Sequence, residues 1–171
     1  TMPATEPPQT PADPATGVPL SLAEQRARRI SAITYDLHFA IPEKPADPID
    51  ARATIAFTLA DVSGPVFLDF AGPPDRIKRL AAGSQAVPVR VVNEHVAIPA
   101  SALRAGANTI AIDFTAGDAS LNRTADFMYT LFVPARARLA FPCFDQPDLK
   151  ARYTLSLEIP AAWEALANGA E

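Results

Sequence analysis

The sequence is poor in the residues that most often build metal or disulfide sites. It contains two histidines, one cysteine and one tryptophan among 171 residues. A single cysteine excludes an internal disulfide framework. The histidines, His38 and His95, lie 57 positions apart, so the helical H-E-x-x-H arrangement of two imidazoles and a general base cannot occur. Since a hydrolytic zinc site needs three protein ligands and an open position, we expect no such site in this chain.

Composition also argues against several other classes of protein. The formal net charge is −4 and nothing in the sequence resembles the basic footprint of a nucleic-acid-binding protein, so nucleic-acid binding is not expected. No apolar run approaches the ~18 residues of a membrane span. The sequence has no G-x-S-x-G, P-loop or G-x-G-x-x-G motif, and its carboxylates form no evident catalytic pair. Its 49% apolar and 20% charged residues are typical of a globular domain.

The first residues are rich in proline and poor in large apolar side chains. Five of the 18 prolines lie within the first 14 residues. Such a segment cannot offset the entropy cost of ordering itself, so we expect a flexible leader over residues 1–19 and a single β domain over residues 20–171. A Pro-rich leader resembles a tether that follows an export signal. It therefore favours the periplasm or cell envelope over the cytoplasm.

One helix is predicted directly after this leader, over residues 20–30. Ser21 and Glu24 have the spacing of a capping box, in which each side chain satisfies a backbone N–H at the helix start. Three arginines cluster toward the end, where they complement the helix dipole. A second, shorter helical stretch is predicted over residues 99–103.

From Ile33 onward the apolar residues alternate with polar ones, which is the pattern of strands with one buried face. The alternating positions are Ile33 to Ile41, Ala53 to Leu59, Val66 to Phe70, Val87 to Val91, Ile110 to Phe114, Phe127 to Val133 and Tyr153 to Ile159. Turn clusters separate them, and no helices intervene. The sequence therefore predicts an all-β fold, an antiparallel β-sandwich or strongly twisted sheet pair with one short N-terminal helix.

Three residues have side chains that could act as a catalytic group or metal ligand, but a structural role explains each of them more simply. His38 lies on the polar face of its strand and His95 in a predicted hairpin, so both are expected to be solvated. Cys143 has no neighbour in the sequence that would lower its pKa. It is expected to be a small buried residue rather than a nucleophile.

Residues 137–153 read A-R-L-A-F-P-C-F-D-Q-P-D-L-K-A-R-Y. This run resembles the A-R-x-x-F-P-C-x-D-x-P-x-x-K-A-x-F signature of the aminopeptidase N-like zinc metallopeptidase family (the gluzincin aminopeptidases). The residues Tyr35 to Phe39, Trp163 and Asn168-Gly169 extend the resemblance, which covers about Ile30 to Glu171. It implies the family's amino-terminal β domain, which packs on a zinc-binding catalytic domain of the same polypeptide. The chain itself would hold no cofactor.

The signature residues are expected to be structural rather than catalytic. They are Phe141, Pro142, Cys143, Asp145, Pro147 and Lys150. The two prolines fix φ and restrict the residues before them, which predicts a rigid loop between two strands. Asp145 and Lys150 have opposite charges and are expected to pair across it.

One departure from the family pattern concerns the substrate. In many relatives a Q-x-E-A element precedes the signature, and its Glu binds the free amino group of the peptide. Here Leu131 stands at the Gln position, Val133 at the Glu position and Pro134 at the Ala position. None can bind an amine through its side chain. Asp126 and Tyr129 are the nearest polar residues that could replace the missing Gln and Glu. Tyr129, however, lies on the same strand face as Phe127 and Leu131, which is expected to be buried.

The resemblance implies an accessory domain that shapes the substrate entrance of an enzyme removing amino-terminal residues from peptides. Two alternatives stay open: a free-standing β-sandwich module that binds carbohydrate or protein, and a scaffold relative without catalysis. In the family, further strands follow the Asn-Gly. We therefore expect an exposed sheet edge here, covered by the leader or used in a chain–chain contact.

Overall fold

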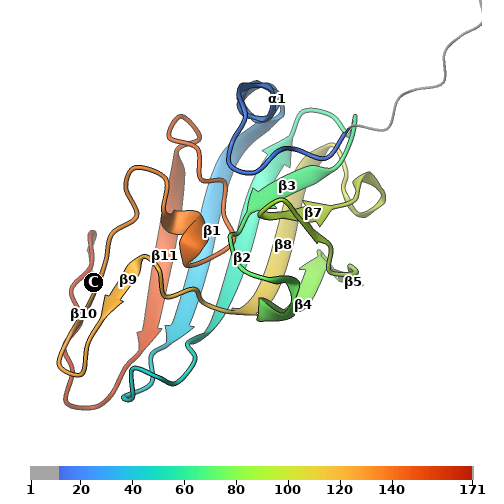
Figure 1. Ribbon diagram of the computed structural model, residues 1–171. Helices are drawn as coiled ribbons and strands as arrows, with labels where there is room; N and C mark the ends of the chain where they lie inside the picture. Colours follow the sequence, from blue (N-terminus) through green and yellow to red (C-terminus); the bar gives the residue numbers. More distant parts are fainter. Residues whose placement is uncertain (1–11, 171) are drawn as a thin grey trace, which may run out of the picture.

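A six-stranded sheet is the framework of the protein (Figure 1). The structure is a computed structural model that describes residues 12–170. In spatial order the strands are β11 (Ala151–Glu158), β1 (Ile30–Ala40), β2 (Asp50–Leu59), β8 (Gly106–Thr115), β4 (Ile77–Ala82) and β5 (Gln85–Ala86). All neighbours run antiparallel except β1 and β11, which run parallel. A parallel pair needs a long crossover, and here residues 41–150 provide it.

Smaller elements complete the fold. A three-stranded sheet is formed by β3 (Val66–Asp69), β7 (His95–Ile98) and β6 (Val91–Val92). A separate arm consists of β9 (Leu121–Arg123) and β10 (Met128–Thr130). The helices are α1 (Leu20–Arg29) and the single 3₁₀ turns η1 (Pro74–Arg76), η2 (Ala100–Ala102) and η3 (Ala137–Leu139). The predicted all-β class with one short helix is confirmed, and the parallel β1–β11 pair is the exception to antiparallel pairing.

The core lies between the six-stranded sheet and the elements packed on one of its faces. Alternate residues of β2 are buried, from Ala53 to Leu59, and their neighbours are only half-buried. Residues of β3 and β7 such as Leu68 and Ile98 belong to the same cluster and are fully buried. Each large apolar side chain that is fully buried contributes roughly 1.5–3 kcal/mol. The period-two pattern therefore predicted the core face of these strands correctly.

Helix α1 begins differently from the prediction. Pro19 occupies the N-cap, and no side chain caps the helix, so the predicted Ser21–Glu24 capping box is wrong. The physical reason is position: Ser21 is already the second helical residue and cannot occupy the extended N-cap conformation. The helix is instead held by two buried arginines, Arg26 and Arg29. Arg29 donates to the backbone carbonyl of Gly64 at 3.1 Å.

The predicted strand over residues 127–133 is shortened to β10, and its inward face is the reverse of the prediction. The four residues expected to be buried (Phe127, Tyr129, Leu131 and Val133) are all exposed, whereas Met128 and Phe132 pack against the core. Alternation gives the period but not which face turns inward. Because β9 and β10 pair only with each other, no neighbouring strand imposes the expected face. Residues 87–91 are also shorter than expected, with only Val91 in a strand.

The described part of the leader lies against the β6–β7 turn. Asn93 Nδ2 donates to the carbonyl of Pro14 at 3.0 Å, and Arg90 pairs with Asp13. Residues 1–11 and Glu171 fall outside the described residues, so the leader predicted over residues 1–19 stays a prediction there. Among residues 12–170, no helix is long and apolar enough to cross a membrane.

Candidate functional site

The signature loop, defined here as residues 137–150, crosses the core face of the long sheet and joins the arm to β11. Its centre pairs with β3: Asp69 N donates to Cys143 O at 2.7 Å and Cys143 N to Asp69 O at 3.1 Å. At its start, η3 lies directly over Gly117, whose N–H donates to Ala140 O at 3.1 Å. A Cβ at Gly117 would sit 1.8 Å from Leu139 O, so only glycine fits there.

Two aromatic residues of the loop anchor it in the core. The Phe141 ring makes edge contacts with Phe39, at a centroid distance of 6.2 Å, and with Phe132, at 5.6 Å. Phe144 contacts Phe57 at 5.6 Å. The backbone N–H of Phe144 donates to the Tyr35 hydroxyl at 2.9 Å. Burial raises the pKa of the Tyr35 phenol, so this hydroxyl stays neutral in the physiological range.

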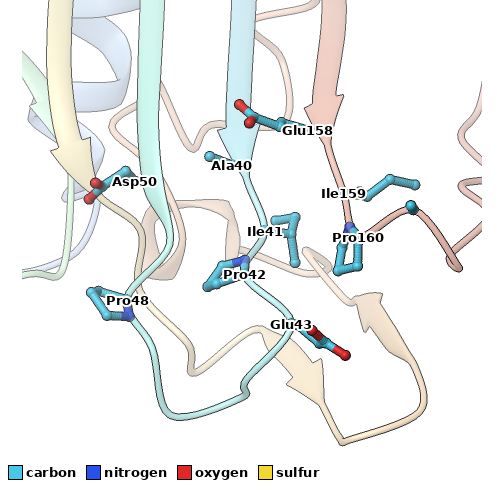
Figure 2. A pocket seen from close by; sticks show the side chains of 10 residues that line it. Ala40, Ile41, Pro42, Glu43, Pro48, Asp50, Glu158, Ile159 and Pro160 are labelled. Atoms are coloured by element: carbon cyan, nitrogen blue, oxygen red, sulfur yellow. The ribbon is translucent and has the colours of Figure 1, made fainter.

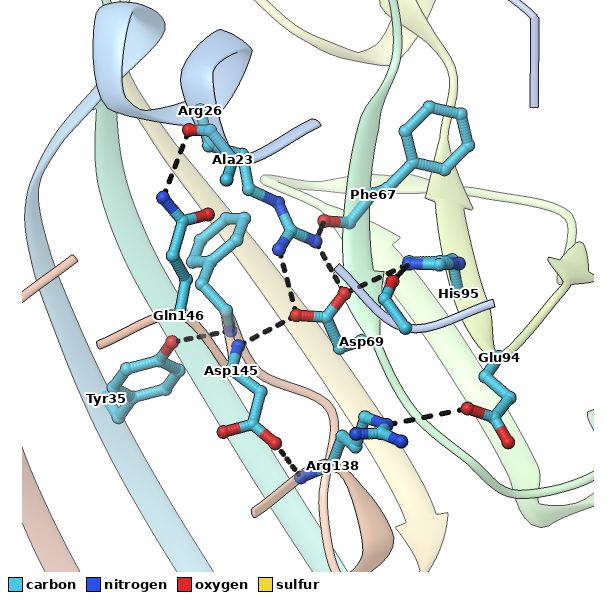
Figure 3. Close-up of polar contacts among 12 residues, drawn as sticks. Ala23, Arg26, Tyr35, Phe67, Asp69, Glu94, His95, Arg138, Asp145 and Gln146 are labelled. Carbon is cyan, nitrogen blue, oxygen red and sulfur yellow. Dashed lines mark hydrogen bonds and ion pairs between the residues drawn. The ribbon is translucent and has the colours of Figure 1, made fainter. Parts of the chain in front are cut away.

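A buried charged cluster ties the loop to helix α1 and strand β3 (Figure 3). Arg26 and the Asp69 carboxylate form a two-pronged ion pair with N–O distances of 2.7 and 2.9 Å, and both side chains are almost completely buried. Asp69 also accepts the backbone N–H of Asp145 at 2.8 Å. Burial alone would raise the pKa of Asp69, but hydrogen bonds from His95 and Arg26 outweigh it, and the pKa is lowered. The carboxylate is therefore charged and fully engaged.

The predicted solvation of the histidines is confirmed for His38 and wrong for His95. His38 is exposed on the outer face of the sheet, 3.9 Å from Glu158. His95 is completely buried. Its Nε2 donates to the carbonyl of Gly17 at 2.8 Å and lies 3.2 Å from Asp69. Those partners come from distant segments, so its sequence neighbours could not reveal the burial.

Asp145 and Lys150 do not pair as predicted. Lys150 is exposed and makes no ion pair within residues 12–170. Asp145 turns the other way and accepts the backbone N–H of Arg138 at 3.1 Å, while Arg138 itself lies 3.4 Å from Glu94. Burial raises the pKa of Asp145 above its ordinary value. The rigid loop is thus held by backbone contacts and by the charges of Asp69 in β3 and Glu94 in the β6–β7 turn.

Cys143 is buried, as predicted. Burial raises the pKa of its thiol well above the ordinary value, and the neighbouring charge of Asp145 adds to this effect. A thiol held neutral is a poor nucleophile. Pro142 is buried beside it, whereas Pro147 lies at the exposed end of the loop.

An exposed apolar row runs along the arm and ends shortly before the signature loop: Phe127, Tyr129, Leu131 and Val133. Val133 is 69% exposed and Phe127 55%. The rings of Phe127 and Tyr129 stack at 6.3 Å between centroids. The row includes both positions at which the resemblance expects substrate-anchoring polar side chains. Asp126, the carboxylate that the sequence offers as a substitute for the missing substrate-binding Glu, is exposed at the tip of the arm.

A shallow groove of about 510 Å³ opens where β1 and β11 end (Figure 2). Prolines and carboxylates line it, among them Pro42, Glu43 and Glu158. The adjoining β1–β2 loop is fixed from the arm by Arg123, whose guanidinium donates to four backbone carbonyls, including that of Asp47 at 2.8 Å.

The residues that the structure describes do not fit a zinc site. Among residues 12–170, no cluster of three or more His, Cys, Asp or Glu side chains could hold a metal ion. The two imidazoles lie on different sheets, one exposed and one engaged with Gly17 and Asp69.

Comparison with known sequences gives a consistent match. Residues 93–171 match the Peptidase M1 N-terminal domain. Aminopeptidase N of Streptomyces lividans is 24% identical over 166 residues, covering 91% of this chain and 19% of that protein. Glutamyl aminopeptidase of Sus scrofa is 51% identical over 35 residues, covering 20% of this chain and 4% of that protein. The chain thus spans about a fifth or less of these relatives.

Solved structures share the fold. The M1 zinc metallopeptidase of Deinococcus radiodurans aligns with a TM-score of 0.61 at 18% identity, over 75% of this chain and 32% of that one. Leukotriene A4 hydrolase of Saccharomyces cerevisiae aligns with a TM-score of 0.58 at 18% identity, over 82% of this chain and 27% of that one.

Proposed function

We propose that this chain, which belongs to the M1 zinc metallopeptidase family as an amino-terminal domain, is the accessory β domain of a zinc-dependent aminopeptidase. In this proposal it packs on a catalytic domain of the same polypeptide and forms part of the substrate entrance. The catalytic domain holds the zinc ion, which supplies an activated water for hydrolysis of the amino-terminal peptide bond. Residues 12–170 supply positioning and surface only.

The observation that carries this proposal is the exposed apolar row on the arm. Four large side chains on one face of an extended segment are exposed, although the neighbouring signature loop is rigidly buried. Apolar patches that lack a partner within a domain commonly mark a contact surface. The row also lies beside the loop that matches the family signature. A catalytic domain covering this row would remove it from water.

We further propose that this segment does not bind the free amino group of the substrate. Leu131 and Val133 are exposed, uncharged and apolar. An ammonium group is bound best by a carboxylate through charge-assisted hydrogen bonds. The catalytic domain would then bind the amino terminus unaided, and the row would contact apolar parts of the peptide or the other domain.

A binding titration tests the docking proposal. The 171-residue chain is titrated into separately produced catalytic domain of the same polypeptide. The double variant L131D/V133D should weaken binding about tenfold or more, since buried contact residues dominate interface energies. The control is R28D, because Arg28 is exposed on α1 away from the row. Equal affinities for the row variant and the wild-type chain would contradict the proposal.

The stacked Phe127–Tyr129 pair supports a second candidate, a free-standing module that binds carbohydrate on an aromatic platform. A glycan-binding screen of the chain decides between the two: sugar binding lost in Y129A would favour the module. A scaffold relative without catalysis would dock as described but leave the assembled protein inactive. A location in the cell envelope is also proposed, from the Pro-rich leader, and fractionation of cells producing the native polypeptide tests it.

A further inference from the structure

One side chain of the arm is bonded to the β1–β2 loop (residues 41–49) through its whole guanidinium. Arg123 is the last residue of β9 and directly precedes the turn at the tip of the arm, residues 124–127. Its Nη1 and Nη2 donate at 2.8 to 3.0 Å to four backbone carbonyls of the loop, those of Pro42, Lys44, Pro45 and Asp47. All the terminal N–H groups of the guanidinium are therefore engaged with one loop, which Figure 2 shows beside the groove.

The β1–β2 loop is a rigid partner for this side chain. Its ends are fixed because Ile41 and Ile49 are buried in the core. Between them the backbone is restricted by three prolines: Pro42, Pro45 and Pro48. Asp47 N donates to Lys44 O at 3.0 Å and closes a turn. Since a guanidinium also holds its donors in a fixed plane, the four hydrogen bonds determine where the end of β9 lies.

Arg123 and the exposed apolar row lie on opposite faces of the arm. Arg123 is the cross-strand partner of Met128, and such partners share a face. Met128 packs against the core, so this face is the inner one. The next residue, Tyr129, points to the other face together with its partner Asn122, and it is 54% exposed. The bonds of Arg123 on the inner face therefore fix the direction in which the outer face is presented.

The turn at the tip of the arm extends the hold of Arg123 to Phe127. Thr124, which follows Arg123 directly, donates its N–H to Phe127 O at 2.9 Å. In return, Phe127 N donates to the Thr124 hydroxyl at 3.1 Å. The Phe127 ring in turn stacks on that of Tyr129. At the base of the arm Phe132 packs against the core, so the arm is held by apolar contact at its base and by Arg123 at its tip.

We propose that Arg123 is a positioning residue for the substrate entrance. This inference rests on the proposed function, in which the arm forms part of that entrance. Arg123 acts through the arm rather than on the substrate: it holds Phe127 and Tyr129 where they meet apolar side chains of a peptide. Residues 43–48 are exposed, so water can replace the guanidinium at most of these carbonyls. The hydrogen bonds of Arg123 therefore affect the place of the arm more than the stability of the domain.

Kinetics of the whole polypeptide test this role, with trileucine as the substrate. R123A should raise KM about tenfold and leave kcat within about twofold, because a displaced arm weakens binding of the substrate and of its transition state equally. R123K should give an intermediate KM, since an ammonium has three donors for four carbonyls. Two controls should match the wild type. K44A removes an exposed side chain but keeps the carbonyl that Arg123 binds, and R104A removes an exposed arginine at the opposite end of β8 from the arm.

Hydrogen exchange of the same polypeptides distinguishes a failure of this inference from a failure of the proposed function. R123A should speed exchange at the amides of Thr124 and Phe127 and leave β2 unchanged. Millimolar guanidinium chloride, far below the molar range in which it denatures, should restore both the protection and the KM by occupying the place of the lost side chain. Unchanged exchange in R123A, faster exchange with an unchanged KM, or a KM that guanidinium does not restore would overturn the role of Arg123.

A wild-type polypeptide that hydrolyses no peptide would instead refute the proposed function. Faster exchange in R123A would then show that Arg123 holds the arm but serves no substrate entrance, which overturns this inference as well. Unchanged exchange would refute the hold on the arm itself.

Discussion

Arg26 of helix α1 and Asp69 of strand β3 form a two-pronged ion pair that is buried beneath the signature loop. Arg26 also lies 5.4 Å from the centroid of the Phe144 ring, and Asp69 accepts the backbone N–H of Asp145. The pair therefore joins the helix, the small sheet and the signature loop. Gln146 adds a parallel link by donating to Ala23 O at 3.0 Å.

Removing Arg26 should destabilise the domain strongly. R26M leaves the Asp69 carboxylate buried without its cation, and breaking a buried pair on one side typically costs about 3–5 kcal/mol. Denaturant unfolding measures the change. The matched control is R28M on the exposed face of the same helix, which should stay within about 0.5 kcal/mol of the wild type. A similar loss in the free energy of unfolding for R26M and R28M would show that the buried Arg26–Asp69 pair contributes no more to stability than an exposed arginine.

The pH dependence of stability should reflect Asp69. Its pKa is lowered in the folded state, so at low pH the unfolded chain binds the proton more readily. The stabilisation is present above the unfolded pKa of about 3.9 and is lost as the pH falls through the lower folded value. Asp145 has the opposite sign, because its raised pKa makes protonation favour the folded state.

Melting temperatures measured between neutral and acidic pH check this expectation. The wild type should lose stability on acidification, and D69N should be less stable at neutral pH with a flatter acid limb. An equally steep acid limb in D69N would assign the loss to other carboxylates.

Gly117 should tolerate no side chain. In G117A the added Cβ would collide with Leu139 O, so η3 must move, at a cost of about 3 kcal/mol or more. The control is G83N, because Gly83 has open space around it and a positive φ of 57° that Asn accepts. Thermal unfolding separates the two. A G117A melting curve that matches the wild type would contradict the close packing of the loop.

Cys143 should be unreactive while the domain is folded. Its thiol is buried and its raised pKa keeps it neutral. A thiol reagent should label the native chain slowly and the unfolded chain at once. Rapid labelling under native conditions would mean that the signature loop opens readily. C143S provides the blank for the assay.

The sequence predicted those features that depend on local pattern. Alternation located β1, β2 and β8 and their buried faces, and the prolines and aromatics around Cys143 indicated a rigid, buried loop. The sequence-based prediction failed where contacts with distant segments of the chain determine whether a residue is buried. His95 is buried only because Gly17 and Asp69 come to it, 78 and 26 positions away.

The arm shows the same limit. The alternation of residues 127–133 was recognised, but the inward face depends on how the arm leaves the sheet, and Phe132 rather than Leu131 packs on Phe141. One signal for the charged cluster was present: Asp69 is a lone carboxylate in the apolar run Val66 to Phe70. A buried carboxylate requires a cation, and Arg26 supplies it.

An aminopeptidase assay tests the central claim most directly. The purified 171-residue chain is incubated with aminoacyl reporter substrates, alone and together with the catalytic domain of its polypeptide, with and without a chelator. The account predicts no turnover by the chain alone, no stoichiometric zinc in it, and chelator-sensitive turnover once the catalytic domain is present. Chelator-sensitive hydrolysis by the chain alone would contradict it.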